Sequence, residues 1–129
     1  MSRYPFFDRQ QVRLRPIHER GHDLLVSRML PLAHPEKPCE SPDFIQLVTA
    51  IRQARERDRP VILMMGGHPI KLGLSRFLID LMRRGFLTHI ATNGAGIVHD
   101  FELATVGGTS ENVSRWIQEG QFGLWEETT

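Results

Sequence analysis

Glycines, a histidine and two carboxylates stand close together in the stretch THIATNGAGIVHDFE, residues 88–102. An apolar run leads into the glycines at 94 and 96, and His99, Asp100 and Glu102 follow. Glycine lets a ligand approach the backbone without a Cβ in the way, and free N–H groups at a helix start favour a phosphate. The stretch therefore predicts either a ligand-binding loop or only a tight structural turn.

The polar residues after these glycines have three interpretations. As metal ligands, His99 and Asp100 would diverge, because neighbouring side chains point apart. His68 or His89 would then have to supply a third ligand. A hydrolase-like alternative requires His68, His89, His99 and Asp100 to meet at one site. As acids near a helix start, Asp100 and Glu102 would only favour the helix dipole. As groups just past a phosphate loop, they would bind a ribose or a cationic substrate, with His99 and Asp100 as candidate catalytic residues.

Two further turns are rich in glycine, at residues 66–69 and 107–110. None of the three matches the GxGxxG fingerprint. Gly94 and Gly96 could be its first two glycines, but His99 stands where the third would be. The first two turns each follow an apolar run. If those runs are parallel strands, both turns lie at the carboxyl edge of the sheet, where ligands of open α/β sheets bind.

The composition is that of a soluble globular protein. The 129 residues are 40% hydrophobic and 24% charged, with a formal net charge of +1. This balance gives no electrostatic reason to expect nucleic acid or an acidic membrane as a partner. A single cysteine, Cys39, excludes an internal disulfide and fits a reducing compartment. With no apolar run of signal-peptide or transmembrane length, the sequence predicts a cytoplasmic protein.

Residues 1–40 differ from the rest of the chain. Five prolines break helices and central strands there, so we expect an extended arm with at most one short helix near residues 21–29. The arginines that cluster early in this arm are expected to be solvated. Residues 41–129 form the second predicted domain.

Helix and strand signals alternate from residue 41. Ser41-Pro42-Asp43 starts an apolar-faced helix, and residues 61–65 form a strand that is apolar on both faces. A helix from His68 to Gly85, a strand over residues 86–92 and a short helix after Asp100 follow. A last helix, capped by Thr109 or Ser110, ends at Gly120. This order is typical of a parallel α/β sheet with flanking helices.

The predicted sheet is too small to be complete. Two parallel strands leave edges and faces uncovered, and the aromatic residues near 122–125 are expected to be exposed. We therefore expect a partial domain of a larger α/β unit, or a homo-oligomer that buries the remaining apolar surface.

The segment from Gly67 to Glu102 resembles the dinucleotide-binding segment of the deoxyhypusine synthase family. In that family a strand, a small-residue turn and a helix lead to a second strand, a glycine loop and nearby acidic residues. The resemblance implies a Rossmann-like NAD-binding fold, oligomerisation and NAD-dependent transfer chemistry on an amine substrate. The resemblance assigns cofactor contacts to His68, Ser75, Thr92, Asn93, Gly94, Ala95, Gly96 and Asp100. The glycine turn after the first strand and the acids after the second add Gly66, Gly67 and Glu102 to the expected cofactor-binding residues.

Two departures limit the resemblance. His99 stands where the family has an acid beside the position of Asp100. The family's catalytic lysine lies in a late segment that has no counterpart here, and neither Lys37 nor Lys71 takes over its role. The expected function is the NAD-binding portion of a synthase-like enzyme, and the alternative is a non-catalytic nucleotide-binding or assembly module.

Overall fold

The computed structural model describes residues 3–6, 8–33 and 36–129, so part of the predicted arm (residues 1, 2, 7, 34 and 35) lies outside the described residues. The chain forms two compact units. The first joins Met1–Asp23 to Ser110–Thr129, and the second is Leu24–Thr109. The predicted boundary at residue 40 does not separate these units, because residues 24–40 belong to the second one.

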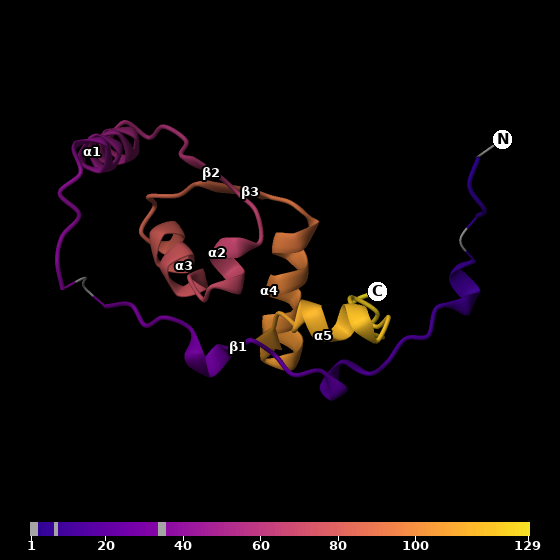
Figure 1. The fold of residues 1–129 in the computed structure, drawn as a ribbon. Helices are drawn as coiled ribbons and strands as arrows, with labels where there is room; N and C mark the ends of the chain where they lie inside the picture. Colours follow the sequence, from indigo (N-terminus) through magenta and orange to yellow (C-terminus); the bar gives the residue numbers. More distant parts are fainter. Residues whose placement is uncertain (1–2, 7, 34–35) are drawn as a thin grey trace. The chain divides into compact units, whose positions relative to one another are not determined.

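The second unit is built around a parallel strand pair. β2 (Ile62–Met65) pairs with β3 (His89–Thr92), with Ile62 opposite His89 and Met65 opposite Thr92. Figure 1 shows α2, α3 and α4 together on one side of this pair. The mixed α/β fold is as predicted, but among the described residues each sheet has only two strands.

The helix predicted after the first strand is two helices. α2 (His68–Lys71) and α3 (Ser75–Arg83) are separated by Gly73, whose φ of +83° lies in the left-handed region that favours glycine. A Cβ on Gly73 would also lie 3.3 Å from the Cα of Met29. The N-terminal segment of this unit therefore packs against the chain at the interruption between α2 and α3.

The predicted NGAG loop is instead the first turn of a helix. α4 (Gly94–Val106) begins at Gly94, and Asn93 is its N-cap. The Asn93 side chain accepts a hydrogen bond from the N–H of Gly96, the usual way in which asparagine starts a helix. The helix ends where Gly107 adopts a φ of +71°. The prediction of a loop was wrong because three small residues were read as a turn, although a strong N-cap precedes them.

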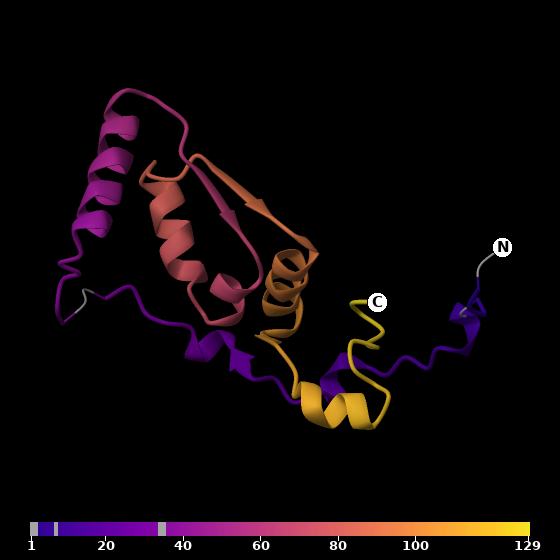
Figure 2. The same cartoon turned by 45° about the horizontal axis from the view of Figure 1, so that its top comes forward.

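One face of the strand pair is uncovered, which corrects the prediction of a strand buried on both sides. Met64 is 81% exposed and Ile62 is 59% exposed. α1 (Pro42–Glu56) forms where the sequence predicts it, but none of its described residues is buried. Figure 2 shows the strand pair and the helices of this unit from a second direction. The unit therefore leaves large apolar side chains of β2 and α1 exposed.

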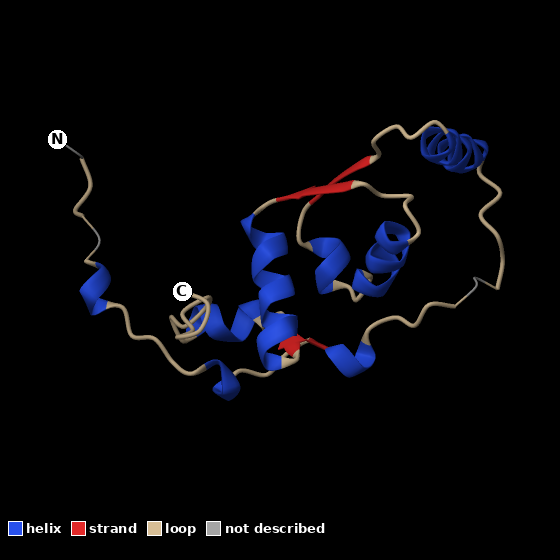
Figure 3. Ribbon diagram, turned by 180° about the vertical axis from the view of Figure 1, so that it is seen from behind, coloured by secondary structure: helices blue, strands red, loops and turns tan. Residues whose placement is uncertain are grey.

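A short antiparallel strand pair joins the first and the last segments of the second unit. β1 (Leu24–Leu25) pairs with β4 (Gly108–Thr109), with Leu24 opposite Thr109. Both strands appear in red in Figure 3. β4 follows directly after the end of α4, so the third glycine turn of the sequence is the connection that returns the chain to β1.

The first unit has a core of Ile17, Trp116 and Trp125, all at most 2% exposed. The two tryptophan rings meet edge to face, with centroids 5.0 Å apart. Trp116 lies on α5 (Val113–Gln118), whose N-cap is Asn112 and not the predicted Thr109 or Ser110. The expectation of exposed C-terminal aromatics was wrong for Trp125, which is fully buried.

Arginines of the N-terminal segment contribute to this core. Arg20 is only 5% exposed, its guanidinium lies 5.5 Å from the Trp125 ring centroid, and it faces the Glu111 carboxylate at 3.9 Å. Arg15 lies over Trp116. The prediction of solvated arginines was therefore wrong for Arg20, whose burial is compensated by the Trp125 ring and Glu111.

None of the helices described in this structure is long and apolar enough to cross a membrane.

Candidate functional site

The parallel pairing of β2 and β3 brings the first two glycine turns together. Gly66 follows β2 and Asn93 follows β3, and a Cβ built on Gly66 would lie 3.7 Å from Asn93 Nδ2. The turns are neighbours because both strands end at the same edge of the sheet. The expectation that these turns lie side by side is therefore confirmed.

Two of the glycines at this edge are required by the chain's own packing. A Cβ on Gly67 would lie 2.8 Å from His99 Cδ2 and 3.1 Å from the carbonyl group of Ala95. A Cβ on Gly96 would collide with Thr92 Oγ1. Glycine at these positions lets α2 approach α4 and lets Thr92 fold over the start of α4, so packing within the chain already explains both glycines.

Gly94 is the open position of the edge. A Cβ there would have no atom within 4 Å, and the residue is the first of α4. The first N–H groups of a helix have no partner within the helix, and the positive end of the helix dipole lies at the same place. Because Asn93 already satisfies the N–H of Gly96, an anion at this edge would be bound near Gly94 and Ala95.

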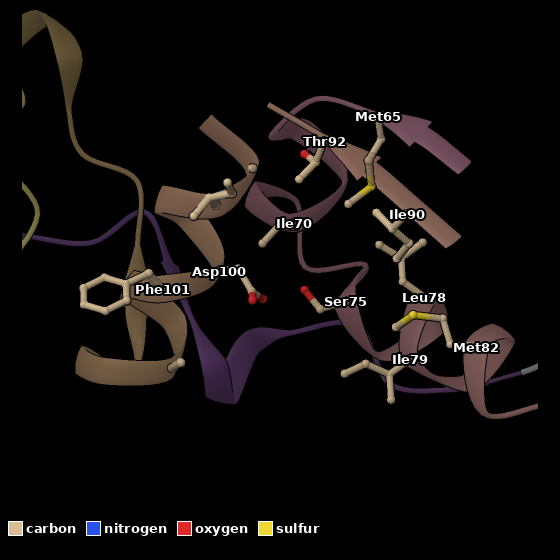
Figure 4. A pocket seen from close by; sticks show the side chains of 13 residues that line it. Met65, Ile70, Ser75, Leu78, Ile79, Met82, Ile90, Thr92, Asp100 and Phe101 are labelled. Carbon is tan, nitrogen blue, oxygen red and sulfur yellow. The ribbon is translucent and has the colours of Figure 1, made fainter. Parts of the chain in front are cut away.

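A pocket of about 550 Å³ lies beside this edge, within the range of small-molecule sites. Figure 4 shows its lining, which comes from the inner face of the strand pair, from α2 and α3 and from one face of α4. Apolar side chains dominate the lining: Met65, Ile70, Leu78, Ile79, Met82, Ile90, Ile97, Phe101 and Ala104. Sequence reasoning missed this pocket, because these residues look like ordinary core positions of amphipathic helices and strands.

Three polar side chains line the same pocket: Ser75, Thr92 and Asp100. In Figure 4 the hydroxyl of Ser75 and the carboxylate of Asp100 point toward each other across it. Ser75 is 8% exposed, and its buried Oγ has no hydrogen-bond partner. A buried hydroxyl without a partner is unfavourable, so a ligand group placed between Ser75 and Asp100 would satisfy it.

His99 and Glu102 lie on another face of α4. Their side chains are joined through Thr109 of β4: His99 Nδ1 is 2.8 Å from Thr109 Oγ1, which donates to Glu102 Oε2 at 2.5 Å. Glu102 and Thr109 are 3% and 0% exposed, and neither lines the pocket. The structure thus separates His99 from Asp100, which the sequence had grouped as candidate catalytic residues. Thr109 was missed because only the fold brings it to the helix.

The remaining predicted residues lie around the edge. His68 is the first residue of α2, is exposed, and is not part of the pocket lining. Ala95 contributes its backbone to the contact with Gly67. Within the described ranges, no group of three His, Cys, Asp or Glu side chains has a geometry that could hold a metal ion.

Compared with protein-family models, with curated proteins and with solved structures, the chain has no match.

Proposed function

We propose that the chain is the NAD-binding portion of a deoxyhypusine synthase-like enzyme, with a Rossmann-like arrangement and an amine as the substrate. The observation that carries the proposal is the convergence of two glycine turns at one edge of a parallel strand pair, next to a pocket of ligand size. In this proposal the pyrophosphate lies at the start of α4, near Gly94. A ribose or the substrate amine lies in the pocket between Ser75 and Asp100.

The polarity of the pocket supports this assignment. A ribose hydroxyl can donate to the Asp100 carboxylate and accept from Ser75, which would pair the buried Ser75 Oγ. An amine would instead gain from the negative charge of Asp100. The apolar remainder of the lining suits the flat faces of a nicotinamide ring or the methylene groups of an alkyl amine.

Titration of NAD into the protein by calorimetry tests the proposal. We expect saturable binding, weakened in Asp100→Asn by about 1.5–3 kcal/mol, the range for hydrogen bonds to charged groups. Asp43→Asn is the matched control, because Asp43 is an exposed carboxylate in the first turn of α1, outside the pocket lining. Absence of heat with the folded wild-type protein would exclude NAD as the ligand.

A second candidate function is a non-catalytic assembly module, and the uncovered sheet face favours it. On this face Ile62 and Met64 are 59% and 81% exposed, and Phe44 and Leu47 of α1 are exposed as well. Under both functions we expect a homo-oligomer that covers Ile62 and Met64. The two functions are therefore distinguished by the effect of NAD on the melting temperature. A melting temperature that NAD does not raise favours the assembly module.

Light scattering after size-exclusion chromatography tests the homo-oligomer. We expect a mass of at least two chains, reduced to one chain in Met64→Lys, because a charge would be buried at the interface without a partner. Thr105→Lys is the control, since Thr105 is exposed on α4 and not on the open sheet face. A monomeric wild-type protein would contradict the expectation.

A further inference from the structure

The part of the pocket that α3 lines is polar at one end and apolar along the rest of its length. Ser75 is the first residue of α3, and Leu78, Ile79 and Met82 follow it on the same helix face. With the usual rise of about 1.5 Å per residue, this row extends about 10 Å from Ser75 to Met82. The pocket therefore suits an elongated ligand that has a polar group at one end only.

The charge of the lining is confined to the polar end. Among the described residues that line the pocket, Asp100 is the only charged one. Asp80 is also on α3, but it does not line this pocket, and its carboxylate pairs with Arg84 at 3.2 Å. A cationic group is thus attracted to Asp100 alone. A second cation further along α3 would lie against apolar side chains without a counter-ion.

Ser75 and Asp100 together suit an ammonium group. Asp100 is exposed, so a cation beside it stays partly in water and loses little of its hydration. The buried Ser75 Oγ has no hydrogen-bond partner, and a hydroxyl oxygen can accept one of the three ammonium hydrogens. Because both oxygens of a carboxylate accept hydrogen bonds, Asp100 can bind this ammonium group and a ribose hydroxyl of the proposed cofactor together.

We propose that the pocket binds a primary monoamine with an apolar tail, and that Leu78, Ile79 and Met82 select against amines that carry a second charge. The inference rests on the proposed function, because it names the class of amine that the same site takes. The ammonium group lies between Ser75 and Asp100, whose side chains face each other in Figure 4. The methylene groups lie between α3 and the inner face of the strand pair.

Calorimetric titration with unbranched primary amines, from butylamine to decylamine, tests the apolar part of the pocket. Each added methylene group is expected to lower the dissociation constant by up to about fourfold, the effect of burying one CH₂. The gain is expected to stop once the chain extends past Met82, where the lining of α3 ends. A dissociation constant that does not depend on chain length would overturn the proposal.

Hexylamine and hexamethylenediamine test the selection against a second charge. The two molecules have the same six-carbon chain, but the diamine has an ammonium group in place of the terminal methyl group. We expect the wild-type protein to bind the diamine at least about tenfold more weakly, since its second ammonium group would lose hydration against apolar side chains. Equal or tighter binding of the diamine would overturn the proposal.

A carboxylate at position 82 is expected to reverse this preference. Met82 is 41% exposed, so the new side chain in Met82→Glu can reach water, and the fold is expected to tolerate it. The variant is expected to bind hexamethylenediamine more tightly than hexylamine. Leu72→Glu is the matched control, because Leu72 is exposed and does not line the pocket. An unchanged preference in Met82→Glu, or the same change in both variants, would contradict the role of α3.

The amine titrations and the NAD titration can fail separately. If NAD binds but none of the alkylamines does, the present inference is overturned and the proposed cofactor site is not. If the alkylamines bind with the expected selectivity and NAD gives no heat, the NAD-binding function fails, while the selectivity of the pocket is supported.

Discussion

Replacement of Trp125 by alanine is expected to lower the free energy of unfolding of the first unit by about 3–5 kcal/mol, the usual cost of removing a buried aromatic side chain. Trp125 is 0% exposed and meets Trp116 edge to face at 5.0 Å. Its indole N–H donates to Glu111 Oε2 at 3.1 Å, and Arg20 lies over its ring. The substitution removes the largest part of a three-residue apolar core and leaves buried charges without their aromatic partner.

Denaturant unfolding followed by the emission of Trp116 measures this loss, because Trp116 is the tryptophan that remains and belongs to the same core. Phe122→Ala is the matched control. Phe122 is an aromatic residue three positions away, but it is 46% exposed, so its removal is expected to cost much less. Equal losses for the two variants would mean that Trp125 is not part of a core.

Alanine at position 96 is expected to lower the free energy of unfolding of the second unit by about 1–3 kcal/mol, the range for overpacking. The new methyl group would overlap Thr92 Oγ1, with Thr92 Cβ at 3.2 Å and Cγ2 at 3.4 Å. Rotation of the Thr92 side chain can move Oγ1 away, but Thr92 Cβ does not move with this rotation and still lies 3.2 Å from the new methyl group. The unit must therefore displace the end of β3 or the start of α4.

Thermal unfolding followed by circular dichroism measures the effect, and Gly94→Ala is the control. Gly94 is also in the first turn of α4 but has no atom within 4 Å of its Cβ position, so alanine there is expected to be neutral or slightly stabilising. Combining Gly96→Ala with Thr92→Ala is expected to recover part of the loss, since the colliding oxygen is removed. Equal stability of the two glycine variants would show that Thr92 does not pack on Gly96.

Substitutions of Gly94 and Gly96 distinguish a role in folding from a role in ligand binding. Gly96 is explained by packing alone, whereas Gly94 has no packing reason in the second unit to be glycine. In the proposed function, position 94 is glycine because a ligand approaches the backbone at the start of α4. Loss of NAD binding in Gly94→Ala with unchanged stability would therefore be a result that packing does not explain.

The amino-acid sequence by itself determined the local elements. Ser41-Pro42-Asp43 started a helix where α1 begins, and the apolar run before Gly66 became β2. These signals depend on neighbouring residues along the chain, such as proline at the first helical position and apolar periodicity. The mixed α/β class and the parallel pair with adjacent glycine turns followed from the order of the same elements.

Tertiary structure alone decided which residues meet. The aromatic end of the chain looked exposed because nothing near it in sequence could cover it, yet Ile17 and Arg20 lie about a hundred positions away and enclose Trp125. Thr109 likewise joins His99 to Glu102 only because β1 and β4 pair. Contacts between distant residues depend on how whole elements pack, and short-range patterns carry no information about that.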